Sequence, residues 1–151
     1  MTLTKNRKIV CIHFFYFFLH IIKFKLKRKL FAIYKFAFVL TTGIINDATA
    51  IKDLAMAKYG FPEANITSLF NEEASREKII SELKRLVNVA KAGDIVFIFY
   101  AGHGSQMKNS LSKEVDKKDE TMVPSDTWKK GVMDIRDKEL SYYFNLLIDK
   151  G

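Results

Sequence analysis

The fold of this chain is decided by residues 93–106, which are GDIVFIFYAGHGSQ. Residues 95–100 form an unbroken run of β-branched and aromatic side chains with turn residues before it. Such a run is typical of a strand that is buried on both faces in the middle of a parallel sheet. We therefore predict a central strand here, followed directly by a polar loop over residues 101–126.

Helical patterns surround this strand. One helix is expected to start at a cap formed by Asn46 or Asp47 and to end at Tyr59, before Gly60. A short strand is expected at residues 66–70. Ser75 is suited to cap a second helix, because a serine oxygen can accept a hydrogen bond from the backbone of the first turn. Apolar residues recur along that helix at a spacing of about 3.6, which predicts a buried stripe of Ile79, Ile80, Leu83, Leu86, Val87 and Ala90.

A third helix is expected to be capped by Asp137 and to be followed by Gly151 as its terminating glycine. Helices that alternate with buried strands predict an α/β sandwich with a mostly parallel sheet.

The charge of the chain is unevenly distributed. The formal net charge is +8, with 25 basic and 17 acidic residues, but residues 1–40 carry nine of the basic residues and no acidic one. Residues 41–151 therefore hold 16 basic and 17 acidic residues. A domain without a net basic surface is not expected to bind nucleic acid.

Residues 1–40 differ in composition from the rest, so we expect a boundary at residue 40 and one domain over 41–151. The apolar run at 9–22 has 14 residues, which is short for a membrane span of roughly 20. A membrane-associated segment and an atypical N-terminus joined to a genuine domain both stay open, and part of 29–33 is a candidate first strand. The chain has one cysteine, Cys11, which excludes an internal disulfide and favours a reducing compartment such as the cytoplasm.

The chemistry lies directly after the predicted central strand, in Gly102-His103-Gly104. Catalytic groups in open α/β sheets collect at the carboxyl ends of the strands. A histidine at that position can act as a general base near neutral pH. Its glycine neighbours permit unusual backbone angles and the close approach of another chain.

Residues 93–106 resemble the strand-and-histidine motif of caspases and metacaspases. The resemblance extends upstream to Gly43-Ile44-Ile45-Asn46-Asp47-Ala48, and downstream through the acidic segment at 114–126 to Ile135-Arg136-Asp137-Lys138-Glu139-Leu140. It implies a caspase-like three-layer sandwich, incomplete at its C-terminal end, and a cysteine-type endopeptidase that acts on proteins or peptides. His103 would be its general base, with Gly104 in the flanking loop.

The resemblance implies two further sites. Asp47 matches a metacaspase aspartate that helps to bind an Arg or Lys side chain of the substrate. Asp126 and Asp137 resemble carboxylates that bind calcium in calcium-dependent members, and no other cofactor is expected. Lys138, however, stands where those members have a second aspartate, so calcium is a weak candidate here. Asp116, Asp119 and Glu120 are expected to be a solvated acidic loop.

The nucleophile is the missing part. A caspase cysteine follows its histidine by about 50 residues, and the sequence has its single cysteine at position 11. We expect residues 1–151 alone to lack peptidase activity, and we expect the central strand to lack a neighbour on one side. The alternatives are a non-catalytic caspase-fold module that acts by binding, a membrane-associated protein governed by residues 1–40, and a serine hydrolase using Ser105. The last lacks the Gly-x-Ser-x-Gly pattern of such enzymes.

Overall fold

The structure, a computed structural model, describes residues 10–14, 27–34, 43–109, 111 and 115–150, with side chains from Ala48 onward. Its main sheet contains four parallel strands in the spatial order β1-β4-β2-β3. These strands are β1 (Val10–Phe14), β2 (Lys27–Tyr34), β3 (Ile66–Leu69) and β4 (Asp94–Ala101).

The central strand predicted from residues 95–100 is confirmed as β4. It is paired on both edges, with β2 on one side and β1 on the other. The expectation that β4 lacks a neighbour is therefore wrong, because Val10 to Phe14 align with Phe97 to Ala101 along its second edge.

The N-terminal region takes part in this sheet. The candidate strand within residues 29–33 is confirmed as β2, which lies between β3 and β4. Because β1 and β2 both come from residues 1–40, the sheet crosses the boundary that composition placed at residue 40. Within the described residues, no helix combines the length and apolar character needed to cross a membrane.

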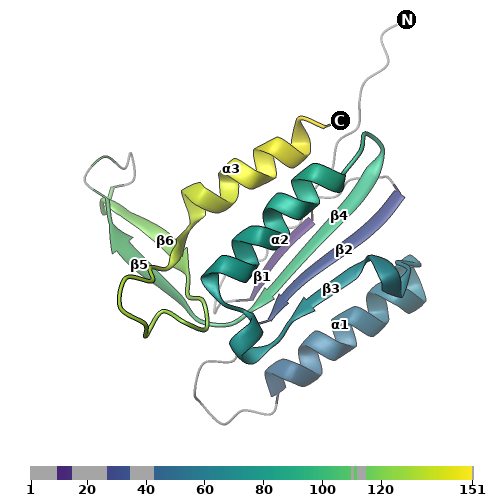
Figure 1. Ribbon diagram of the computed structural model, residues 1–151, viewed down its shortest axis with the longest axis horizontal. Coiled ribbons are helices and arrows are strands. Elements are labelled where there is room, and N and C mark those ends of the chain that lie inside the picture. The colour runs from purple at the N-terminus through teal and green to yellow at the C-terminus, as the bar shows by residue number, and fades with distance from the viewer. Residues whose placement is uncertain (1–9, 15–26, 35–42, 110, 112–114, 151) are drawn as a thin grey trace, which may run out of the picture.

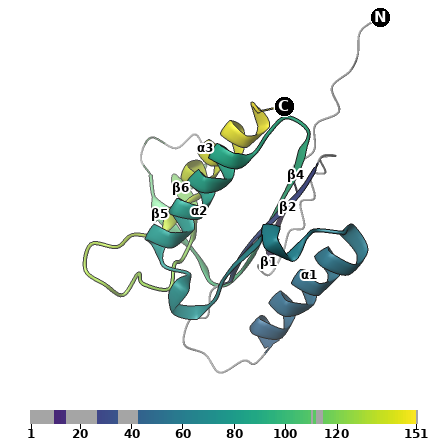
Figure 2. The same ribbon diagram turned by 45° about the vertical axis from the view of Figure 1, so that its right-hand side comes forward.

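Three helices cover the two faces of the sheet. They are α1 (Gly43–Tyr59), α2 (Arg76–Val89) and α3 (Asp137–Ile148). α2 and α3 lie together on one face and α1 lies on the other, as the edge-on view shows (Figures 1 and 2). The three-layer α/β sandwich is therefore confirmed. Short 3-10 turns, η1 (Glu63–Asn65) and η2 (Asn71–Glu73), flank β3.

The helix starts that the sequence predicts agree with the structure for α2 and differ from it for α1. Ser75 caps α2 as expected, since its Oγ accepts a hydrogen bond from the Lys78 amide at 3.4 Å. α1 begins at Gly43, so the start predicted at Asn46 or Asp47 is wrong. α3 has Asp137 as its first helical residue, one position after the cap residue Arg136. Gly151 lies outside the described residues.

The core is built on alternate residues of β4. Val96, Ile98 and Tyr100 pack against α2 and α3, whereas Phe99 and Ala101 pack toward α1. The stripe predicted on α2 is confirmed, with Ile79, Leu83, Leu86 and Ala90 buried and Ile80 and Val87 packed beside them. Burial of these side chains is the main source of stability.

A second, three-stranded antiparallel sheet follows β4. Its strands are β5 (Gly104–Lys108), β6 (Lys118–Met122) and β7 (Ile135–Arg136). Residues 101–126 therefore contain a β5–β6 hairpin, and the prediction of one long loop is wrong. Regular period-2 hydrophobicity is absent from this polar stretch, so the sequence carried no strand signal there.

Asp119 on β6 connects this sheet to α3. Its carboxylate is 1% exposed, so the expectation that Asp119 belongs to a solvated loop is wrong. Both carboxylate oxygens accept hydrogen bonds from Asn109 Nδ2, at 3.0 and 2.9 Å. Arg136 Nη1 and Lys138 Nζ lie 2.9 and 3.2 Å from the same carboxylate. The hydrogen bond from Asn109, together with Arg136 and Lys138, holds the pKa of Asp119 below its usual range although burial acts in the opposite direction.

Replacing Leu83 by alanine tests the core. Leu83 is 0% exposed, and such a truncation should lower the free energy of unfolding by about 2–5 kcal/mol. Leu54 on α1 is 38% exposed, so Leu54→Ala is the matched control and should cost under about 1 kcal/mol. Denaturant unfolding of both variants measures the difference, and equal losses would contradict the packing described.

The lowered pKa of Asp119 predicts a pH dependence of stability. A carboxyl group whose pKa is lower in the folded than in the unfolded state stabilises the fold above its unfolded-state pKa. That contribution is lost as the pH falls through the folded-state value. The difference in melting temperature between the wild type and Asp119→Asn should therefore be largest near neutral pH and should narrow below the ordinary aspartate value of 3.8. Thermal unfolding of both proteins between pH 7 and about pH 3 measures it, and a constant difference would contradict the ionic role.

Candidate functional site

His103 lies just beyond the carboxyl end of β4, two residues after Ala101 and directly before β5. The carboxyl ends of parallel strands form the edge of an α/β sheet where ligands and catalytic groups gather. The residue is exposed, and within the described part of the chain its imidazole makes no hydrogen bond. The ring is therefore accessible to a substrate or to a further catalytic group.

The backbone of His103 is held from two sides. The hydroxyl of Tyr100 donates a hydrogen bond to the His103 carbonyl at 2.7 Å, and the amide of Val123 donates to the same oxygen at 3.0 Å. Burial raises the pKa of the Tyr100 phenol, so this hydroxyl keeps its proton and stays a donor across the physiological range. The position of His103 is thus fixed through its main chain while the side chain is left exposed.

The two glycines that flank His103 do not adopt the unusual backbone angles that their lack of a side chain would permit. The glycines with positive φ in the described residues are Gly60, Gly93 and Gly131, so Gly102 and Gly104 adopt ordinary backbone angles. Gly104 begins β5 and is aligned with Met122 of β6. The close approach of another chain to these glycines stays a prediction.

Residues 123–126, which begin with the residue bonded to the His103 carbonyl, also contact the start of α2. Two residues after Val123, the Ser125 amide donates to the carbonyl of Ala74 at 2.9 Å. Asp126 Oδ1 then accepts a hydrogen bond from the Arg76 amide at 2.8 Å, at the N-terminus of α2. A carboxylate is favourable there because it satisfies a free amide and complements the helix dipole. Asp126 thus fixes α2 against residues 123–126.

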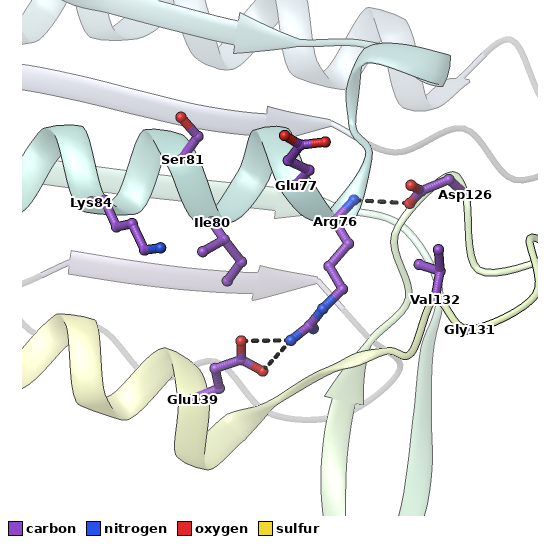
Figure 3. A pocket seen from close by; sticks show the side chains of 9 residues that line it. All are labelled: Arg76, Glu77, Ile80, Ser81, Lys84, Asp126, Gly131, Val132 and Glu139. Carbon is purple, nitrogen blue, oxygen red and sulfur yellow. Dashed lines mark hydrogen bonds and ion pairs between the residues drawn. The ribbon is translucent and has the colours of Figure 1, made fainter.

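Arg76 crosses an open cavity next to this contact (Figure 3). Its Nη2 donates to both carboxylate oxygens of Glu139 on α3, at 2.7 and 2.9 Å, and its Nη1 donates to the carbonyl of Asp134 at 3.0 Å. The cavity measures about 550 Å³ and lies between α2, the start of α3 and the loop before β7. Nine residues line it: Arg76, Glu77, Ile80, Ser81, Lys84, Asp126, Gly131, Val132 and Glu139.

The two calcium candidates have different partners. Asp126 accepts from the Arg76 amide, whereas Asp137 Oδ2 is paired with Lys138 Nζ at 2.7 Å. In the part of the chain that the structure describes, no three His, Cys, Asp or Glu side chains are grouped as a metal site.

The remaining predicted residues lie on other elements. Asp47 is the fifth residue of α1, and its side chain is outside the described part of the structure, so its role in substrate binding stays a prediction. Ser105 is exposed on β5. Cys11 lies on β1, where it is aligned with Ile98 of β4, five residues before His103. At about 3.3 Å per strand residue this is a separation of roughly 16 Å along the strand, which is far too long for a thiol–imidazole pair.

Two residues around the site, Tyr100 and Arg76, were not predicted from the sequence to contribute to it, and the burial of Asp119 at the β6–α3 junction was not predicted either. The sequence predicts Tyr100 only as a buried residue of the strand, because nothing local indicates that its hydroxyl turns back to the carbonyl of His103. The side chain of Arg76 has partners 58 to 63 residues away in the sequence, and that of Asp119 has partners 10 to 19 residues away. Such pairs become visible only when the chain has folded.

Comparison with known proteins now identifies the family. The model of the metacaspase peptidase C14 domain matches residues 28–149. Metacaspase-1 of Plasmodium falciparum is 38% identical over 117 residues, which are 72% of this chain and 19% of that protein. Metacaspase-9 of Arabidopsis thaliana is 37% identical over 91 residues, which are 56% of this chain and 28% of that protein.

A crystal structure of a protein from Geobacter sulfurreducens shares the fold, with a TM-score of 0.63 and 25% identity over 80% of this chain and 45% of that one.

This chain spans less than a third of the length of the two metacaspases. The matched region begins inside β2 and includes all of β4, His103 and α3, so the chain belongs to the metacaspase family.

Proposed function

We propose that this chain provides the histidine-bearing part of a cysteine-type endopeptidase, with His103 as its general base. The observation that carries the proposal is the placement of His103, which has an exposed ring at the carboxyl end of β4 and a main chain held by Tyr100 and Val123. Membership of the peptidase C14 domain supports the same assignment.

In the proposed reaction a cysteine thiol loses its proton to the imidazole of His103 and attacks the carbonyl carbon of a peptide bond. The resulting imidazolium then gives that proton to the departing amine as the carbon–nitrogen bond breaks. Water afterwards releases the acyl group and regenerates the thiol. This sequence requires the His103 ring to accept, hold and return one proton, so the ring must be accessible both to the thiol and to the departing amine.

The topology indicates where the nucleophile would enter. The crossover from β3 through α2 leads toward β4, and α3 lies on the same face as α2. Because βαβ crossovers are right-handed, a strand following α3 would be placed on the far side of β4 from β2. β1 occupies this position. We therefore place the nucleophile on such a strand, in a form of the molecule in which β1 has been displaced.

The proposed substrate is a protein or peptide with Arg or Lys at the cleavage site. The support is Asp47, whose carboxylate is a suitable partner for a cationic side chain. The single cysteine is compatible with a reducing compartment, so we propose that the protein acts in the cytoplasm.

The direct test is a peptidase assay of residues 1–151 with Arg- and Lys-containing peptides, with and without calcium. We expect no cleavage above background, because Cys11 is distant from His103. Cleavage that is lost in Cys11→Ser or in His103→Ala would contradict this expectation. A gene product that contains a cysteine after α3 should cleave the same peptides, and His103→Ala should abolish its activity whereas Ser105→Ala should retain it.

The same experiment decides between the peptidase and a non-catalytic module. If a longer product with a cysteine after α3 is folded and inactive, His103 has no catalytic role and the domain acts by binding. The register of Cys11 favours that second function for residues 1–151 taken alone.

Removing one hydroxyl tests how His103 is positioned. In Tyr100→Phe the His103 carbonyl retains the Val123 amide and loses its shorter hydrogen bond, so the free energy of unfolding should fall by about 1–2 kcal/mol. The Val123 amide should also exchange its hydrogen faster, which hydrogen-exchange NMR measures. Tyr142→Phe removes an exposed hydroxyl from α3 and is the control. Unchanged Val123 exchange in Tyr100→Phe would show that Tyr100 does not hold the loop.

A further inference from the structure

The side chain of Lys138 lies between two carboxylates at the junction of β6 and α3. Its Nζ is 2.7 Å from Asp137 Oδ2 and 3.2 Å from Asp119 Oδ1. Asp119 is buried and Asp137 begins α3, so a single ammonium group joins the second sheet to the helix. The shorter contact has the length of a charge-assisted hydrogen bond, which is stronger than a hydrogen bond between neutral groups.

The rest of the Asp119 carboxylate is also occupied. Arg136 Nη1 donates to Oδ2 at 2.9 Å, and Asn109 Nδ2 lies 3.0 and 2.9 Å from the two oxygens. Two negative charges, on Asp119 and Asp137, are therefore matched by two positive charges, on Lys138 and Arg136. The cluster is neutral as it stands.

A calcium ion does not fit among these groups. Calcium takes six to eight oxygen ligands at 2.3–2.6 Å, whereas the oxygens of Asp119 already face an ammonium, a guanidinium and an amide NH₂ group. An added divalent cation would have to displace the Lys138 ammonium, which lies within 3.2 Å of both Asp119 and Asp137. The second candidate, Asp126, is engaged with the N-terminus of α2.

We propose that the Lys138 ammonium takes the place of a divalent cation between Asp119 and Asp137. The β6–α3 junction of this chain is therefore held together without calcium. The proposal goes beyond the peptidase function, and it is tested by binding and stability. The outcome of that test therefore does not depend on any catalytic role of His103.

The experiment uses the 151-residue chain and calcium chloride, followed by isothermal titration calorimetry and thermal unfolding at matched ionic strength. The wild type should release no binding heat and should show no calcium-dependent change in melting temperature. Lys138→Asp replaces the ammonium by a third carboxylate beside Asp119 and Asp137, and it should create a calcium site. Its melting temperature should rise by roughly 3–8 °C at calcium concentrations about ten to a hundred times the dissociation constant.

Lys84→Asp is the matched control, because it makes the same change of charge at an exposed position of α2 and should leave the protein unresponsive to calcium. Saturable calcium binding by the wild type would overturn the proposal. A folded Lys138→Asp protein with no calcium response would overturn it too, since the carboxylates would then not surround the position of the amine.

Lys138→Gln covers the case in which three adjacent carboxylates prevent folding. It removes the positive charge and leaves Asp119 and Asp137 in place, so calcium should raise its melting temperature more than that of the wild type. An equal response of Lys138→Gln and the wild type would contradict the role of Lys138 as the resident cation.

Discussion

The structure depends on the burial of β4 on both faces and its pairing on both edges. Its alternate side chains enter two different parts of the core, Val96, Ile98 and Tyr100 on the side of α2 and α3, and Phe99 and Ala101 on the side of α1. Its backbone is paired with β1 and β2. A strand fixed in this way can present a residue at its end with little freedom. His103 gains its defined position from that constraint, because it follows the strand by two residues.

The interactions around His103 act mainly on its backbone. Tyr100 is anchored in the core by its ring, and its hydroxyl reaches the His103 carbonyl. Val123 is anchored by the strand that precedes it, β6, and donates to the same oxygen. The peptide group of His103 is therefore held both by β4 and by the second sheet. An imidazole that is located by its main chain and not by its ring remains able to rotate toward a nucleophile.

Much of the fold was predictable from local pattern. The run at 95–100 predicted β4, the period of 3.6 predicted the buried face of α2, and Ser75 predicted where that helix begins. The role of His103 was predictable because a residue directly after a buried parallel strand lies at the edge of the sheet where catalytic groups gather. The errors concern parts that depend on distant partners. β5 and β6 are too polar for a strand pattern and exist because they pair with each other, and Asp119 is buried because Asn109, Arg136 and Lys138 gather around it. The start of α1 at Gly43 was missed because good cap residues at Asn46 and Asp47 lie inside the helix.

Ion pairs join elements that also share the main core. The start of α3 is tied to α2 by Arg76 and Glu139, and to β6 by Lys138 and Arg136 through Asp119. Exposed ion pairs contribute little to stability, but a buried carboxylate left without a partner is costly. Because Asp119 is buried, its partners are required once β6 is in place, and they fix the point at which the chain turns from the second sheet into α3. α3 in turn packs on α2 through Tyr143 and Leu147. The partners of Asp119 and the packing of α3 on α2 therefore both hold the chain where it passes from the second sheet into α3.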